Sequence, residues 1–223
     1  MDRRSFLAGM AMLGGFALTG CASSSPQQQR AEEQSLVDAA TGTVAVFKAN
    51  SGPTGNSLLH KAKAVVIFPD LLKGGVGLGG SRGQGVMLVR GPHGWSDPAF
   101  YETSSVSLGL QLGVEESSVM LFVMSQRALD GLMKNNGFTF KAGGGMSLMD
   151  FNTAAQEQLS GADVVVWSKS KGAYGGLTLS GSDVSQRLDR DQTYYGKPVN
   201  AMQIAQGEVS NKQAAALRSA LGG

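Results

Sequence analysis

The sequence predicts an α+β domain with a mainly antiparallel, strongly twisted or barrel-like sheet and flanking helices, one of them C-terminal. Glycine is frequent, at 32 of 223 residues, and charged residues are only 16%. Such a composition, with runs of valine, leucine and methionine, is typical of sheet and tight turns. In residues 105–113, Val106, Leu108, Leu110 and Leu112 alternate with small or polar residues. This period of two predicts an antiparallel strand with one buried face.

The N-terminus, "MDRRSFLAGMAMLGGFALTGCASSS", has the pattern of a secretory signal at residues 1–20. Two arginines precede an apolar stretch that is too short to span a membrane. An uncleaved membrane anchor is the alternative. "LTGC" resembles a bacterial lipobox, which makes Cys21 the expected lipid attachment site, and "RRSFL" resembles a twin-arginine signal. The general secretory route remains open as well, because two arginines also suit an ordinary signal.

Residues 21–35, "CASSSPQQQRAEEQS", are polar and predict an acylated N-terminus followed by a flexible tether. Residues 36–223 then form one domain. We expect an exported bacterial lipoprotein in the cell envelope, on the periplasmic side of the outer membrane or on the cell surface if the source is Gram-negative. Without residues 1–20 the net charge is +1, which does not favour nucleic-acid binding.

Helical spacing of apolar residues predicts a helix over 34–48, on the face of Leu36, Val37, Ala40, Val44 and Phe47. A further helical turn is expected at 57–63. Strands are expected at 64–69, 85–90, 105–113, 117–125, 137–142, 162–168 and 175–181.

Two helices have clear end signals. The first follows Ser125 as N-cap and stops at Gly137, with Ala128, Leu129 and Leu132 on its apolar face. The second closes the chain, with a capping box at Ser210 and Gln213 and with Gly222 beyond its end.

The segment "KGGVGLGGSRGQG" at 73–85 contains two motifs that carry chemistry in other proteins. Gly75, Gly77 and Gly80 match a dinucleotide-binding pattern, but a β-type run follows where a helix is required. Ser81 lies in a G-x-S-x-G pattern, but no acid followed by a histidine completes a triad. The glycines are better explained by tight turns and close backbone packing.

Other chemical motifs are also incomplete. Ser168 and Lys171 have S-x-x-K spacing without the partner motifs of serine acyltransferases. The two histidines and the single cysteine match no metal-site spacing, and "DRDQTYYG" lacks the glycine and glutamate of a calcium loop. We therefore expect no enzyme activity, no metal and no cofactor.

Basic and aromatic residues accompany the glycine-rich segments, a distribution that suits a membrane interface or a lipid headgroup. The expected lipid contacts are Lys73, Arg82, Lys169 and Lys171, with Trp95 and Tyr101 as interface rings. Core packing of the rings and simple solvation of the lysines is the competing interpretation.

Four blocks occur in one order along the chain and resemble the SYLF domain over residues 36–221: "KAKAVVIFPDLLKGGVGLGGSRGQGVMLVR", "GWSDPAFYETSSVSLGLQLGVEESSVMLFVMS", "ADVVVWSKSKGAYGGLTLSGSDVSQR" and "YYGKPVNAMQIAQG". This lipid-binding module also occurs in a yeast actin-associated SH3 protein and in bacterial secreted lipoproteins. The resemblance implies a non-enzymatic domain. Eukaryotic members bind phosphoinositide membranes, with an N-terminal amphipathic helix implicated.

The segment 34–48 departs from that pattern, because Lys48 is its only base and the acids Glu32, Glu33 and Asp38 accompany it. A phospholipid or lipid A therefore replaces phosphoinositide as the expected partner, and actin would be met only in a host. The first hypothesis is a lipid-anchored envelope protein that binds lipid or an anionic membrane surface. The alternative is a structural or protein-interaction module of the envelope with no lipid ligand.

Overall fold

The computed structural model describes residues 25–76, 78–108, 113–134, 138–139, 147–152, 161–170 and 182–222. The helical elements are α1 (Pro26–Lys61), α2 (Gln126–Met133), α4 (Leu188–Tyr195), α5 (Ala201–Ala205), the 3-10 turn η1 (Lys212–Ala214) and α6 (Ala215–Leu221). The strands are β1 (Ala64–Val76), β2 (Leu78–Gly91), β3 (Gly94–Trp95), β4 (Ala99–Leu108), β5 (Gly113–Val123), β6 (Phe138–Thr139), β7 (Leu148–Asp150), β8 (Val164–Ser170) and β9 (Asp183–Gln186).

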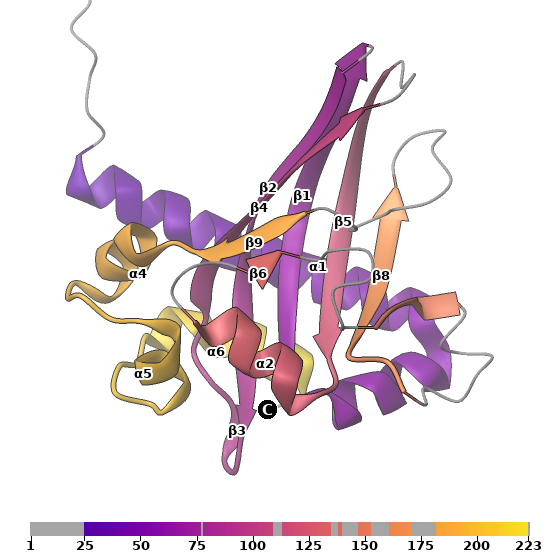
Figure 1. Ribbon diagram of the computed structural model, residues 1–223. Helices are drawn as coiled ribbons and strands as arrows, with labels where there is room; N and C mark the ends of the chain where they lie inside the picture. The colour runs from indigo at the N-terminus through magenta and orange to yellow at the C-terminus, as the bar shows by residue number, and fades with distance from the viewer. Residues whose placement is uncertain are drawn as a thin grey trace, which may run out of the picture.

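The strands form one sheet in the order β6-β9-β4-β2-β1-β5-β8-β7, with β3 paired to β2 (Figure 1). Every pair is antiparallel except β7 with β8. The α+β class, the antiparallel sheet and the C-terminal helix are therefore confirmed. The barrel-like form is wrong for the described strands, because β6 and β7 are the two ends of an open sheet.

The two faces of the sheet carry separate cores. On the first, which we call the α1 face, Val65, Ile67 and Phe122 pack with Val44 and Phe47 of α1. On the opposite α2 face, a second cluster joins the other side chains of the same strands to α2, α5 and β9. Because directly paired residues of an antiparallel sheet share a face, the strand register assigns each later residue to one of these two faces.

The helix predicted over 34–48 is confirmed and is longer than expected. Ser25 and Gln28 form a capping box, and Pro26 occupies the first turn, where its missing N–H costs nothing. The expected flexible tether is thus wrong for residues 26–35, which are helical. At Gly52 the φ of +58° interrupts the helix, so two helical segments meet at a kink.

The glycine-rich segment runs through the long hairpin of β1 and β2, in which Lys73 pairs with Ser81 and Val76 with Leu78. No helix follows it, so the dinucleotide pattern has no helix N-terminus to offer. Close packing is confirmed at Gly85, where an added Cβ would overlap the carbonyl oxygen of Ile67. There β1 has a register shift, since Ile67 pairs with Val86 and Asp70 with Gln84, and such bulges tolerate the intervening proline.

The residues predicted to begin and end the helices are confirmed in part. Ser125 does cap α2, whose Ala128, Leu129 and Leu132 are buried, and the helix ends before Gly137, which lies outside the described residues. In the closing segment Asn211, and not Ser210, accepts the capping hydrogen bond, from the Gln213 N–H. Gly222 ends α6 in the left-handed conformation, as expected.

The strand predictions are largely confirmed, with β1, β2, β5 and β8 covering four of them. Ser105 to Leu108 belong to β4, whereas 109–112 and the strand expected at 175–181 lie outside the described residues. None of the described helices is long and apolar enough to cross a membrane.

Candidate functional site

The far part of the sheet extends beyond the level of the helices (Figure 1). We call it the sheet arm and define it as residues 71–76 of β1, 78–84 of β2, 102–108 of β4 and 113–118 of β5. The first two pair along their whole length, and β4 and β5 flank them. In the arm, the α1 face of the sheet extends past α1, which covers the rest of that face.

The structure separates the predicted basic contacts. Arg82 on β2 and Lys169 on β8 lie on the α1 face, since Arg82 is four residues before the core residue Val86 and Lys169 is two residues after the core residue Trp167. Both are exposed, whereas Lys73 pairs with Ser81 on the α2 face and is half-buried. Lys171 and Cys21 lie outside the described residues. Arg82 and Lys169 are three strand spacings apart across the sheet, about 14 Å, and two residues apart along it, about 7 Å.

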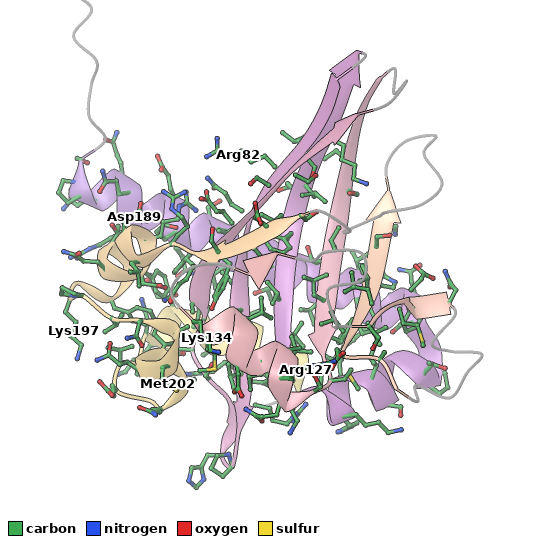
Figure 2. The ribbon with its side chains drawn as sticks, in the orientation of Figure 1. Arg82, Arg127, Lys134, Asp189, Lys197 and Met202 are labelled. Atoms are coloured by element: carbon green, nitrogen blue, oxygen red, sulfur yellow. The ribbon has the colours of Figure 1, made fainter. Side chains whose placement is uncertain are left out.

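The guanidinium of Arg82 is held only weakly by its neighbours. Its side chain is 73% exposed, and its Nη2 lies 3.8 Å from Glu102 Oε2. The same Glu102 oxygen accepts a 2.7 Å hydrogen bond from Arg187, which also pairs with Asp189. Because Glu102 also pairs with Arg187 and Arg82 is largely exposed, the guanidinium of Arg82 remains accessible to solvent (Figure 2).

An exposed leucine accompanies this arginine. Leu72 is 54% exposed and lies directly opposite Arg82 in the register of β1 and β2. Glu116 of β5 lies on the other side of Leu72 on the same face, so the arm carries mixed charge around an apolar residue. Sequence analysis missed Leu72, because it continues the apolar run of a buried strand; only the register shift in β1 turns it outward.

The two aromatic residues expected at a membrane interface are buried, which corrects that expectation. Trp95 is 5% exposed, its Nε1 donates to the Leu221 carbonyl at 3.2 Å, and the Arg90 guanidinium lies over its ring at 4.2 Å. Tyr101 is fully buried, its hydroxyl donates to the Leu132 carbonyl at 2.8 Å, and burial raises its pKa. Core packing, the competing interpretation, describes both rings.

The serines of the motifs have no catalytic surroundings. Ser81 Oγ lies 2.7 Å from Ser105 Oγ across two paired strands. Ser168 lies on β8, paired with Val119, and not at a helix start. In the described part of the chain no group of three potential metal ligands occurs.

Two buried acids attach α4 to the rest of the fold, and sequence analysis did not predict their burial. Asp191 is fully buried and accepts hydrogen bonds from the Phe100 N–H at 2.8 Å and from Gln186 Nε2 at 2.6 Å. Glu33 of α1 is 3.2 Å from Arg190 Nη1. Burial raises the pKa of each carboxyl to about 7, against the opposing effect of Arg190 on Glu33.

A hollow of about 480 Å³ lies between α4 and α5, at the end of the molecule where Figure 2 labels Asp189 and Lys197. Leu188, Pro198 and Val199 supply much of its lining. Little in the sequence predicts this hollow, because α4 and α5 are short helices of eight and five residues. The exposed Leu188, 45% accessible at the start of α4, is the one sequence feature that could have suggested it.

Comparison with known proteins identifies relatives for most of the chain. The protein is 27% identical over 159 residues to SH3 domain-containing YSC84-like protein 1 of Bos taurus, covering 69% of this chain and 46% of that protein. It is 28% identical over 167 residues to SH3 domain-containing protein PJ696.02 of Schizosaccharomyces pombe, covering 71% of this chain and 38% of that protein. LAS seventeen-binding protein 3 of Saccharomyces cerevisiae is 26% identical over 158 residues, covering 68% and 34%.

The matched region therefore spans less than half the length of each of these relatives. The family model Ysc84, described as "Las17-binding protein actin regulator", matches residues 104–223, which is more than half of the chain. That match includes the last residues of β4, all of β5, β8 and β9, and the helices α2, α4, α5 and α6. The SYLF resemblance is confirmed, and the chain belongs to the Ysc84 family.

Proposed function

We propose that this domain binds lipid headgroups or an anionic membrane surface through the α1 face of its sheet arm. The observation that carries the proposal is the exposed pair of Leu72 and Arg82, which lie opposite each other on that face. An apolar side chain beside a cation suits the boundary between acyl chains and anionic headgroups. Lys169 adds a second exposed cation on the same face.

In this proposal the domain is not an enzyme, and an acyl chain on Cys21 holds it at the membrane of a bacterial cell envelope. The α1 helix then acts as the cover of the sheet and not as an amphipathic membrane helix, because its apolar residues Val37, Val44 and Phe47 are already buried in the core.

Vesicle co-sedimentation tests the proposal, with protein that lacks residues 1–21 and so carries no acyl chain. We expect it to bind vesicles that contain phosphatidylglycerol more strongly than pure phosphatidylcholine vesicles. Each cation near an anionic surface contributes about 1 kcal/mol, so the variant Arg82→Glu with Lys169→Glu should bind at least about thirtyfold more weakly. Leu72→Asn should weaken binding at high salt as well, because its contribution is not screened.

The matched control reverses two exposed lysines away from the arm, Lys134→Glu with Lys197→Glu (Figure 2). It changes the net charge equally and should keep most of the binding. Equal loss in both double variants would show a general charge effect and contradict the proposed face. Absence of binding to anionic vesicles or to lipopolysaccharide would contradict the function itself.

A protein-interaction module remains the alternative, and the hollow between α4 and α5 favours it as a second surface. The names of the relatives connect that family with binding of the protein Las17 and with actin regulation. A stoichiometric protein partner recovered from an envelope extract, together with no affinity for lipid, would support this alternative over the first.

A further inference from the structure

The first two turns of α1, residues 26–33, lie beside α4 and depend on one buried side chain (Figure 1). We call these eight residues the α1 start. Glu33 is the only one of them that is buried, at 4% exposure. The next buried residue of the helix is Val37, which belongs to the core of the α1 face. A carboxyl group therefore occupies the position at which an apolar side chain would fix the beginning of an amphipathic helix.

Glu33 meets little that would stabilise a negative charge. Its Oε2 lies 3.2 Å from Arg190 Nη1 but accepts no hydrogen bond from the described residues, so this contact lacks hydrogen-bond geometry. Asp191, the next residue of α4, is fully buried. Among the described residues it accepts hydrogen bonds from two neutral donors, the Phe100 N–H and Gln186 Nε2. Two carboxyl groups thus share this buried junction with Arg190, and ionising both would leave charge that the junction does not compensate.

The other charged groups around the junction largely offset one another. Asp189 disfavours a charge on Glu33, Arg187 favours it, and these two residues pair with each other. Glu32 of α1 also disfavours the charge. The remaining charged or titratable groups near the junction are Arg30 of α1, Tyr101 of β4, Tyr195 of α4 and the Asp97–Arg218 pair beside α6. Burial outweighs the attraction of Arg190, so the pKa of Glu33 is raised to about 7.

We propose that the α1 start is attached to α4 in a proton-dependent way: it docks while Glu33 is protonated and leaves α4 when Glu33 ionises. In the undocked helix this carboxyl faces water and has its ordinary pKa of 4.5. Docking is therefore tightest below about pH 4.5 and weakens as the pH rises to about 7, by at most about tenfold per pH unit. Two helical turns without packing are marginal in water, so the undocked turns fray.

Release of the α1 start would change how far the domain can move from its attachment. Four residues separate Cys21 from Pro26, and the released segment adds eight more. An extended chain spans about 3.3–3.6 Å per residue, against about 1.5 Å in a helix, so the reach grows by about 15 Å. This consequence rests on the proposed acyl anchor, whereas the proton-dependent docking does not.

Hydrogen exchange of backbone amides, followed by NMR on protein without residues 1–21, tests the docking. The amides of residues 30–37 bond to the carbonyls of 26–33, so their protection reports fraying of the α1 start. After correction for the intrinsic exchange rate, we expect this protection to fall at least about tenfold between pH 5 and pH 7.5. Above pH 6 it should stay below the protection of residues 64–68 in β1, which separates local release from global unfolding.

Glu33→Gln keeps the size of the side chain without its charge, so the fall in protection should shrink to less than about threefold. Glu32→Gln is the matched control, because Glu32 is the exposed neighbour on the same helix, and it should keep the full pH dependence. Arg190→Gln removes the attraction that lowers the pKa of Glu33, so the loss of protection should continue to higher pH.

Protection of residues 30–37 that rises with pH would overturn the proposal, because it would show that the ionised pair of Glu33 and Arg190 holds the helix. The same pH dependence in Glu33→Gln and in the unchanged protein would also overturn it. If Glu33→Gln does not fold, Arg190→Gln decides, since protection that no longer depends on pH in that variant would contradict the role of Glu33.

Discussion

Arg90 shows how a single residue joins the N-terminal helix to the sheet. Its Nε donates to the Ala62 carbonyl at 3.1 Å and its Nη2 to the Leu59 carbonyl at 2.6 Å, while its guanidinium lies over Trp95. These carbonyls belong to the end of α1, where helices leave acceptors without partners and where cations are favourable. One arginine thus fixes where α1 leaves the sheet, and with it which part of the α1 face stays open.

The pH dependence of stability follows from Glu33 and Asp191. Their pKa values of about 7 exceed the value near 4 of unfolded acids. Between about pH 4 and pH 7 the folded protein therefore binds more protons than the unfolded chain. The free energy of unfolding should fall as pH rises through this window, by at most about 1.4 kcal/mol per pH unit for each group.

Asp191→Asn should flatten this slope, because asparagine is neutral and still offers an acceptor to the Phe100 N–H. Urea unfolding at several pH values from 4.5 to 8 measures it. Asp163 does not interfere with this measurement, because its pKa of about 2 lies below the pH range used. Burial alone would raise that pKa, but hydrogen bonds from Ser125, Ser147 and Arg127 lower it. A slope that is the same in both proteins would contradict the role of Asp191.

At the scale of elements, two glycines of α1 should respond in opposite directions. Gly42 lies inside the helix with no atom near an added Cβ, whereas Gly52 has a φ of +58° at the kink. Gly42→Ala should raise the free energy of unfolding by about 0.5–1 kcal/mol, and Gly52→Ala should lower it by about 1–3 kcal/mol, because its φ of 58° with a ψ of −155° suits glycine alone. Thermal or urea unfolding of the two variants compares them directly, and the same sign for both would contradict the kink.

The strand β2 offers a second matched pair. An alanine at Gly85 would overlap the Ile67 carbonyl oxygen and approach Phe68 Cδ1, while at Gly91 the nearest atom is 3.6 Å away. Gly85→Ala should therefore destabilise the protein by about 1–3 kcal/mol through overpacking, and Gly91→Ala should change little. Urea unfolding measures both, and equal losses would show that the β1 bulge relaxes freely.

The elements differ in how far the sequence could predict them. Strands with alternating or β-branched residues, and helices with a full apolar face such as α1 and α2, were predictable from local pattern. The helical start at Pro26 was not, because residues 26–32 are polar and their helix is held by the Ser25 cap and by continuity with the buried part. The short helices α4 and α5 depend on tertiary contacts, among them the Tyr194 hydroxyl bonded to Gln34 Oε1 at 3.0 Å.

In the whole molecule, residue type alone could not assign sites, because burial depends on strand neighbours that are distant in sequence. Arg82 and Lys169 were predicted as surface cations and are exposed, but the register places Lys73 on the opposite face. Trp95 and Tyr101 look like interface rings in sequence and belong to the core in three dimensions. Leu72 is exposed beside Arg82 only because of the register shift in β1, and no local sequence pattern predicts that shift.

Membrane binding should accordingly leave the emission maximum of tryptophan fluorescence unchanged. The chain has two tryptophans, and both Trp95 and Trp167 are buried, at 5% and 7% exposure. Titration with phosphatidylglycerol vesicles should therefore shift the emission maximum by no more than about 2 nm even when co-sedimentation shows binding, because neither indole reaches the boundary. A large blue shift would show that the domain opens when it binds.

The contact between the two ends of the described chain also determines when folding can finish. Gln34 Nε2 of α1 donates to the Gln213 carbonyl at 3.4 Å, and Leu217 and Leu221 of α6 share the core of Val37 and Val44. During synthesis α1 leaves the ribosome well before α6, so the earlier helix must wait for the later one. The β1–β2 hairpin can form early from neighbouring residues, but the core beneath α1 closes only after α6 has been made.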